Sequence, residues 1–294
     1  MASGEVIKLY AEQLLLADGW AEDKTLHIVD GIIVEVADGR EEDAEVAKGA
    51  VIPGMVNCHS HAFQRAFAGF SEQGSEGKDS FWTWRQVMYG FLGQVSPEQV
   101  QSIASQLYIE MLKAGYTSVA EFHYLHHQAD GRAYDNLAEM SERIFQAAAD
   151  AGIALTHLPV LYAYSGFGRQ QPNSGQRRFI NSIDQFNQLV SDCMALAGKY
   201  TDCRVGIAPH SLRATDPQML GQAVAHLKSL DSTAPVHIHI AEQQKEVNDC
   251  LAHYGKRPVQ WLLDNQELDE QWCLIHATHI NQQERRGIIE RKAI

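Results

Sequence analysis

The chain has 294 residues, of which 45% are hydrophobic and 21% charged, and these values are typical of a soluble globular protein with a large core. Its formal net charge of −13 argues against a nucleic-acid partner, because phosphate binding needs a basic surface. No apolar stretch reaches the roughly 18 residues of a membrane span. The first residues, MASGE, lack the basic and apolar regions of a secretory signal.

Residues 1–50 are predicted to form a small β unit, part of a β-sandwich. Two β-rich runs there flank Asp30-Gly31, a dipeptide that favours a type I′ turn and therefore a hairpin. From residue 51 onward, apolar runs that indicate strands recur at 51–58, 116–124, 153–164, 203–212, 235–242 and 272–279.

Helical signals lie between most of these runs. Ser96-Pro97 with Gln99 predicts a capped helix start, and Asp216-Pro217 repeats the signal. A helix near 137–151 is predicted to end at Gly152, and another amphipathic helix occupies 281–292.

The alternation of strands and helices predicts βα units and a parallel sheet. For residues 51–294 we expect an incomplete (β/α)₈ TIM-type barrel as the catalytic domain. A doubly wound open sheet is the alternative, although no Gly-rich phosphate turn follows the first strand.

Five cysteines are scattered along the chain without a CxxC motif, which predicts free thiols and a reducing, cytoplasmic location. Cys58 is expected to be a small packed side chain that faces away from His59.

Chemistry-bearing side chains stand at the ends of the predicted strands, which converge on one site in a barrel. His59 and His61 lie two residues apart, so both point to the same face of their strand and are spaced to share a metal ion. The later strand ends carry Glu121, His123, Tyr124; Tyr162, Tyr164; His210, Arg213; His237, His239, Glu242; and His276, His279.

The run VIPGMVNCHSH at 51–61 resembles the first-strand signature of the amidohydrolase superfamily, and His239 and His276 fit its mononuclear-metal deaminases. The segments HSHAFQRAFAGF, FWTWR, EFHY, QRRF, HSLR and HIHIAEQQ, in this order, narrow the resemblance to the formimidoylglutamate deiminases of histidine breakdown. The resemblance implies hydrolysis of the formimino C=N bond of N-formimino-L-glutamate.

That resemblance implies one divalent ion per site, zinc by default, with iron and manganese as alternatives, held by His59, His61 and His239. It implies that Glu242 moves a proton and that His276 polarises the reacting centre. Simpler interpretations stay open: Glu242 as the charge at a helix start, and His276 as a core histidine.

A substrate with two carboxylates calls for arginine, and Arg85 and Arg213 are the candidates. Arg85 has the alternative of stacking on Trp82 or Trp84. Gln64, Tyr124 and His210 are expected nearby. His123 and His237 are assigned to the core.

The family pattern continues through a seventh strand and an eighth that ends in a metal-binding aspartate, and neither is recognised here. We therefore expect a fragment with little or no activity by itself. The alternatives are another deaminase or chlorohydrolase of the superfamily that acts on a heterocyclic ring, and an inactive, non-catalytic remnant. Nothing in the sequence speaks directly for a dimer, so a monomer and a homodimer both stay open.

Overall fold

A computed structural model describes residues 5–70 and 81–294, without the side chains of 81–86. The chain divides into two compact units, Met1–Met55 and Val56–Ile294. The sequence placed this division after residue 50.

The smaller unit is a four-stranded sheet with the strand order β3-β2-β1-β4. Its strands are β1 (Val6–Leu16), β2 (Gly19–Val29), β3 (Ile32–Asp38) and β4 (Glu45–Val46). The first three are antiparallel neighbours, and β4 lies parallel to β1. Asp30 and Gly31 have φ values of 49° and 79°, as a type I′ turn requires. The predicted hairpin is confirmed, since Val29 pairs with Ile32 across this turn.

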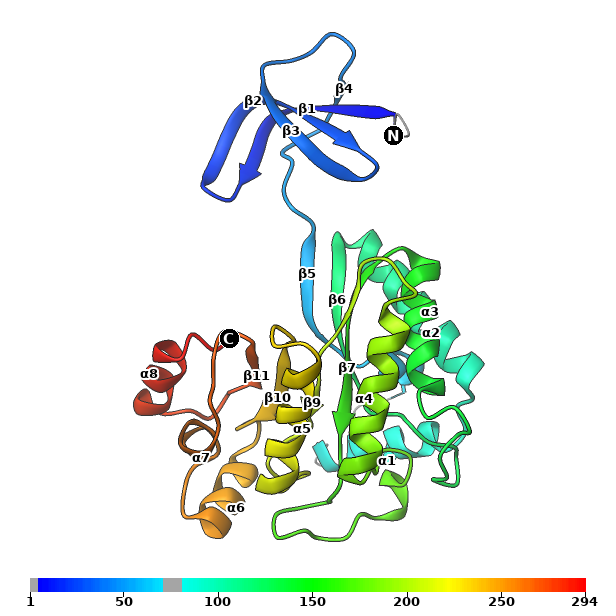
Figure 1. Cartoon of the computed structure of the whole chain (residues 1–294), viewed down its shortest axis with the longest axis vertical. Coiled ribbons are helices and arrows are strands. Elements are labelled where there is room, and N and C mark those ends of the chain that lie inside the picture. The colour runs from blue at the N-terminus through cyan, green and yellow to red at the C-terminus, as the bar shows by residue number, and fades with distance from the viewer. Residues whose placement is uncertain (1–4, 71–80) are drawn as a thin grey trace. The chain divides into compact units, whose positions relative to one another are not determined.

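The larger unit is built on parallel strands (Figure 1). They are β5 (Met55–Ser60), β6 (Tyr116–His123), β7 (Ala154–Leu161), β8 (Cys203–Val205), β9 (Ala208–Pro209), β10 (Val236–Ile240) and β11 (Trp272–His276). One sheet has the order β5-β6-β7-β8, β9 also pairs with β7, and β10 pairs with β11. A parallel bridge between Ile207 and Val236 links the two sets. The strands therefore follow one another in space in their chain order.

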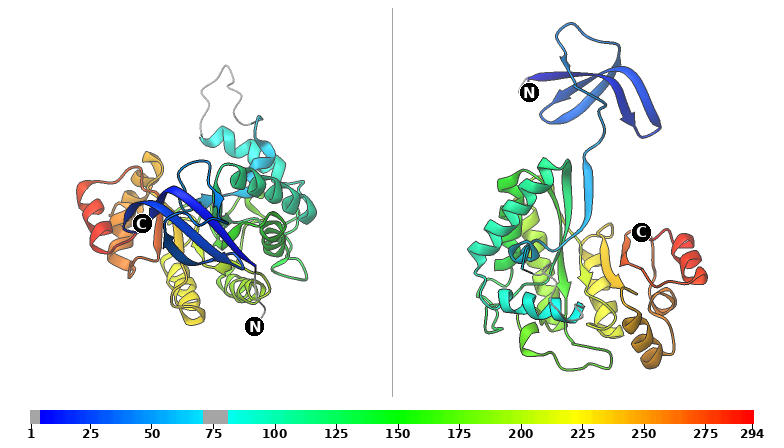
Figure 2. Two further views of the ribbon diagram at one scale, coloured as in Figure 1. Left: turned by 90° about the horizontal axis from the view of Figure 1, so that it is seen from above. Right: turned by 180° about the vertical axis from the view of Figure 1, so that it is seen from behind.

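Helices separate these strands in sequence and cover them in space. They are α1 (Phe81–Leu92), α2 (Pro97–Lys113), α3 (Glu139–Ala151), α4 (Ile183–Ala197), α5 (Pro217–Leu230), α6 (Gln244–Tyr254), α7 (Pro258–Asn265) and α8 (Gln282–Glu290), with short 3₁₀ turns η1 (Ala62–Phe67) and η2 (Ser174–Gln176). Helices α2 to α5 succeed one another around the outside of the strands (Figure 2). This arrangement confirms the predicted fold class as a partial (β/α) barrel.

The predicted helix boundaries rest on local hydrogen bonds. Ser96 and Gln99 form the expected capping box at the start of α2. Gly152 ends α3 in the left-handed conformation, with a φ of 80°. Asp216 caps α5, and Asn281 caps α8.

Two predicted strand runs differ from the structure. The first strand begins at Met55 rather than at Val51, because Pro53 has no backbone N–H to donate to a neighbouring strand. The run 203–212 breaks into β8 and β9 at Gly206, where an added Cβ would lie 2.3 Å from the Pro235 carbonyl oxygen. Cys58 is exposed rather than packed, since β5 is the last strand of its sheet order.

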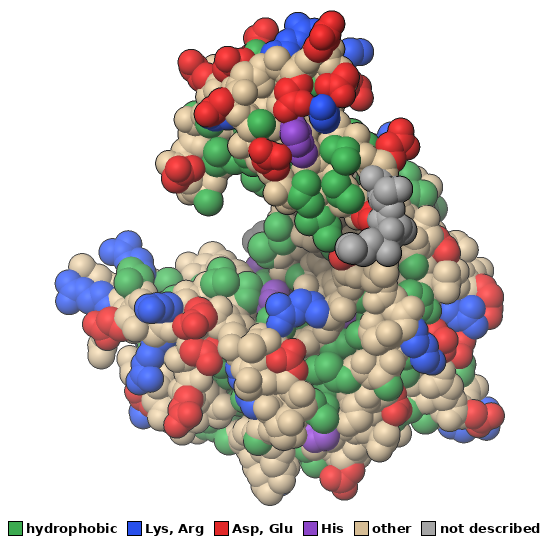
Figure 3. Space-filling model, turned by 45° about the horizontal axis from the view of Figure 1, so that its top comes forward, with side chains coloured by type: hydrophobic (Ala, Val, Ile, Leu, Met, Phe, Trp, Pro, Cys, Tyr) green, Lys and Arg blue, Asp and Glu red, His purple; other side chains and the backbone are tan. Residues whose placement is uncertain are grey.

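The larger unit has two hydrophobic clusters, one centred on Phe122 and Phe145 and the other on Ile238 and Trp272. In the described ranges, no helix is both long enough and apolar enough to cross a membrane. Acidic and basic side chains are interspersed over the face drawn in Figure 3.

Candidate metal centre

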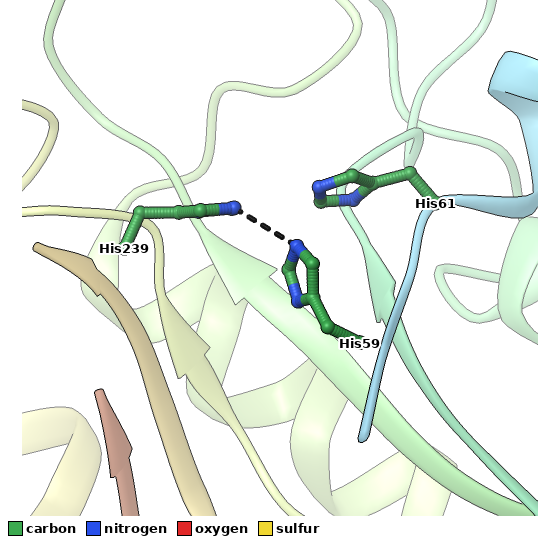
Figure 4. A group of neighbouring side chains, drawn as sticks. All are labelled: His59, His61 and His239. Atoms are coloured by element: carbon green, nitrogen blue, oxygen red, sulfur yellow. Dashed lines mark hydrogen bonds between the residues drawn. The ribbon is translucent and has the colours of Figure 1, made fainter. Parts of the chain in front are cut away.

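Three histidines from two distant strands meet in the larger unit. His59 and His61 come from the end of β5 and the residue after it, and His239 comes from β10. One ring nitrogen from each lies within 4.8 Å of the others, and Figure 4 shows the three rings turned toward one another. Nothing else in residues 5–70 and 81–294 groups three such side chains this closely.

Backbone carbonyls fix the orientation of two of these rings. Nδ1 of His61 lies 2.9 Å from the Phe122 carbonyl oxygen, and Nδ1 of His239 lies 3.3 Å from the His210 carbonyl oxygen. A carbonyl can only accept a hydrogen bond, so Nδ1 carries the proton in both rings. Nε2 then keeps a free lone pair, which is what a metal ligand needs.

Burial keeps all three imidazoles neutral. It lowers the pKa of His59 to about 2, with a smaller contribution from the neighbouring His61. It lowers the pKa of His61 to about 4 and that of His239 well below its usual value. Neutral imidazole is the form that binds metal, so the site is ready for an ion at neutral pH.

The spacing of the His59 and His239 rings fits two ligands of a tetrahedral ion. Nε2 of His59 and Nε2 of His239 are 3.2 Å apart. Zinc–nitrogen bonds of about 2.0–2.1 Å give a tetrahedron with edges of about 3.3 Å. A zinc ion therefore fits this donor set, with His59, His61 and His239 as the residues that would hold it.

Glu242 and His276 face each other beside the triad. Nε2 of His276 lies 3.9 Å from Oε2 of Glu242, and the His276 ring is stacked on that of His239 with centroids 5.2 Å apart. Glu242 lies two residues after the end of β10, and His276 is the last residue of β11; the backbone turns sharply at both places, with φ values of 51° at Ala241 and 72° at His276.

The carboxylate of Glu246 holds the turn that presents Glu242. It accepts hydrogen bonds from the backbone N–H groups of Ala241 and Glu242, at 3.1 and 3.0 Å. Burial raises the pKa of Glu246, which the positive charge of Arg213 opposes. Sequence reasoning missed Glu246, since a backbone contact of this kind leaves no pattern in the sequence.

A cavity of about 380 Å³ contains the triad, Glu242 and His276. Four of the five residues expected to bind substrate line it as well: Gln64, Tyr124, His210 and Arg213. The side chain of the fifth, Arg85, lies outside the described residues. The lining also includes Met88, Tyr89, Tyr162 and Phe179, which the sequence did not assign to the site. Of these, only Tyr162 carried a signal, its place at a strand end.

Two polar groups in this cavity have defined positions. Gln64 donates a hydrogen bond to the Tyr124 hydroxyl at 3.1 Å. Nη1 of Arg213 is buried and has no hydrogen-bond partner within the described part of the chain. A buried guanidinium N–H group without a protein partner is suited to a ligand carboxylate.

His237 and His123 do not line the cavity. His237 is 6% exposed on β10, and burial lowers its pKa to about 4. His123 is fully buried and packs against His157, with ring centroids 5.5 Å apart.

Comparison with known proteins identifies the family of the chain. The amidohydrolase family profile matches residues 50–293. Formimidoylglutamate deiminase from Pseudomonas aeruginosa is 52% identical over 276 residues, which cover 92% of this chain and 59% of that protein. The 8-oxoguanine deaminase of the same organism is 24% identical, over 94% of this chain and 61% of the relative.

Solved structures agree with the fold. The crystal structure of an amidohydrolase from Brucella melitensis superposes with a TM-score of 0.92 at 47% identity, covering 98% of this chain and 63% of that one. An adenosine deaminase from Xanthomonas campestris with bound zinc has a TM-score of 0.72 at 18% identity, covering 98% of this chain and 61% of that one. The chain therefore spans about three fifths of the length of these relatives.

Proposed function

The chain belongs to the amidohydrolase family, a family of metal-dependent hydrolases, and from this premise we propose that it acts in hydrolysis of N-formimino-L-glutamate to N-formyl-L-glutamate and ammonia. One observation carries the proposal. Three neutral imidazoles converge in a cavity that also contains Glu242, His276 and Arg213. The 52% identity to a formimidoylglutamate deiminase supports the choice of substrate.

The reaction adds water to the formimino carbon and expels ammonia. A zinc ion held by His59, His61 and His239 would supply the Lewis acidity that brings the pKa of water to about 7. Glu242 takes the proton from the water as its oxygen bonds to carbon, and the C=N bond becomes a single bond. Glu242 then delivers this proton to that nitrogen, which becomes an amino group. The hydroxyl on the tetrahedral carbon gives up its own proton to the amino group as the C=O bond forms and the C–N bond breaks, and ammonia leaves.

His276 and Arg213 complete this assignment. His276 is assigned to donate a hydrogen bond to the oxygen on the tetrahedral carbon, and the 3.9 Å between its Nε2 and Oε2 of Glu242 supports a role beside the proton shuttle. Arg213 binds one substrate carboxylate through its free Nη1, with Gln64, Tyr124 and His210 lining the same space. Arg85 is proposed for the second carboxylate.

The ligand chemistry favours zinc as the metal, since three neutral imidazoles suit a catalytic zinc site. Iron and manganese are the alternatives that metal analysis would distinguish. The five free cysteines support a cytoplasmic location. The partner is a small dicarboxylate.

A hybrid enzyme tests the activity, because this chain spans 59% of the P. aeruginosa deiminase. In the hybrid, this chain replaces the matching part of that enzyme, and the intact enzyme is the positive control. We expect the hybrid with zinc to release ammonia from N-formimino-L-glutamate but not from 8-oxoguanine. Release from 8-oxoguanine alone, or from neither compound while the control is active, would contradict the proposal.

The substitution Arg213→Met in the same hybrid tests substrate choice. Loss of a charged hydrogen bond to a carboxylate costs about 1.5–3 kcal/mol, so we expect KM for N-formimino-L-glutamate to rise by about tenfold to a hundredfold. An unchanged KM for N-formimino-L-glutamate would mean that Arg213 does not bind a substrate carboxylate. Because a heterocyclic ring substrate needs no such contact, that result would favour the activity of the ring deaminases among the relatives.

A further inference from the structure

Glu121 is a buried carboxylate that lies directly beside the metal ligands but outside the cavity. It is on β6 and is fully buried. Its Oε1 accepts a hydrogen bond from the backbone N–H of Ala62 at 2.6 Å, and its Oε2 accepts one from the Tyr108 hydroxyl at 3.2 Å. The Ser60 side chain also hydrogen-bonds to it.

These contacts enclose His61 from both sides. Ser60 precedes His61 and Ala62 follows it, and both are tied to the same carboxylate. The ring of His61 is tied to the next residue of β6, through the Phe122 carbonyl oxygen. Glu121 thus fixes the backbone on either side of His61, and the Phe122 carbonyl fixes its ring. Both residues lie on β6, which supplies none of the three ligands.

Among the described residues, Glu121 provides the side-chain hydrogen bond at the start of the turn after β5. His61 is the N-cap of η1 and makes no side-chain capping hydrogen bond there. The N–H of Ala62, at the first position of this turn, would otherwise be buried without a partner, which is costly. Burying a carboxylate is costly as well: burial raises the pKa of Glu121 to about 7, against the hydrogen bonds it accepts. A buried carboxylate at position 121, despite this cost, indicates that the backbone at Ala62 must be held in one position.

We propose that Glu121 is a positioning residue for the metal site, whose carboxylate fixes the backbone around His61 so that His59 and His61 present both rings to one ion. This inference rests on the proposed metal site. Residues that orient metal ligands typically contribute tenfold to a hundredfold in metal affinity.

The full 294-residue chain and its variants test this through zinc affinity, measured by competition with a chromogenic chelator. We expect Glu121→Ala to bind Zn²⁺ about tenfold to a hundredfold more weakly. Glu121→Gln keeps an oxygen acceptor for the Ala62 N–H, so its affinity should stay close to that of the unmodified chain. The visible spectrum of bound Co²⁺ should change in the alanine variant and not in the glutamine variant.

Glu284 provides a matched control. It is also fully buried, and it accepts backbone N–H groups from Gln260 and Asn281 in another part of the same unit. Glu284→Ala should lower the thermal unfolding temperature without changing zinc affinity. Tyr108→Phe removes one hydrogen bond to Glu121 but leaves those from Ala62 and Ser60, so it should keep its zinc affinity.

Three results would overturn the proposal: unchanged zinc affinity in Glu121→Ala, equal losses in the alanine and glutamine variants, or an equal loss in Glu284→Ala. If the alanine variant does not fold, Glu121→Asp keeps the charge but draws the carboxylate away from Ala62, and it should show the same loss. Failure of the unmodified chain to bind zinc would instead contradict the proposed function itself.

Discussion

Two groups of clustered histidines occur among the described residues of the larger unit, and only one of them is arranged as a metal site. The cavity group is His59, His61 and His239. The core group is His123, His126, His127 and His157, each at most 2% exposed. Burial lowers the pKa in both groups, so low pKa values and clustering do not distinguish them.

The two groups differ in where the ring nitrogens point. In the cavity group, a carbonyl binds one nitrogen of His61 and of His239, and free nitrogens converge. In the core group, His126 is bonded to the Val160 carbonyl oxygen, while both nitrogens of His157 lack a partner within the described residues. The His157 ring packs against Phe145 instead. Convergence of free lone pairs, rather than the number of histidines, therefore identifies the site.

The largest expected effect is the loss of metal binding when the cavity group is broken. His239→Ala removes one of three ligands, so we expect zinc affinity to fall by more than about a hundredfold, which exceeds the loss from removing a residue that only orients a ligand. Isothermal titration should show one equivalent of zinc on the unmodified chain and none on the variant at micromolar concentration.

The matched change in the core group is His157→Leu. It should leave the zinc stoichiometry and affinity unchanged, because its nitrogens do not converge with others. Replacing a buried polar ring without partners by an apolar side chain should also be neutral or stabilising at pH 7. Loss of zinc from this variant would break the distinction between the two groups.

Lowering the pH should show whether the core histidines are held neutral, because this affects the free energy of unfolding of the metal-free chain. Burial lowers the pKa of His157 from 6.5 in the unfolded chain to about 3 in the folded one. Between these values the unfolded state binds a proton that the folded state excludes, so stability falls as pH falls, by about 1.4 kcal/mol per pH unit for this residue.

The difference in unfolding free energy between the unmodified chain and His157→Leu, followed against pH, reports the proton that His157 binds on unfolding. Urea unfolding at several pH values should give a shallower pH dependence for the variant between pH 6 and 4, by about 1.4 kcal/mol per unit. Above pH 7 the unfolding free energies of the two proteins should change equally with pH. Equal dependence below pH 6 would mean that His157 is not held neutral in the core.

Much of this site follows from sequence because parallel strands end at one edge. Histidines at successive strand ends, such as His59 and His239, were expected near one another for that reason, and they lie together. Helix boundaries followed from local chemistry, as at Ser96 and Gly152, where the cap depends on residues within one turn.

The features of the fold and the site that the sequence did not predict depend on tertiary contacts, which leave no pattern in the sequence. The break at Gly206 arises from the approach of the Pro235 carbonyl, which lies far along the chain. Met88 and Phe179 reach the cavity from a helix and a loop, outside the strand-end rule. Glu121 stood at a predicted strand end, but its role toward the Ala62 N–H needs the fold to be seen.

The smallest expected change in zinc affinity concerns His276. This histidine lines the same cavity as the triad but is not one of its three converging ligands. Its ring stacks on that of His239. Asn tolerates the positive φ of 72° at this position, so His276→Asn limits backbone strain. We expect zinc affinity to change by less than about tenfold, which is less than the usual loss from removing a residue that orients a ligand. In the hybrid enzyme, kcat should fall by about a hundredfold or more, as for loss of a group that stabilises the transition state. A large loss of zinc affinity would instead make His276 a fourth ligand, and the triad would no longer describe the site.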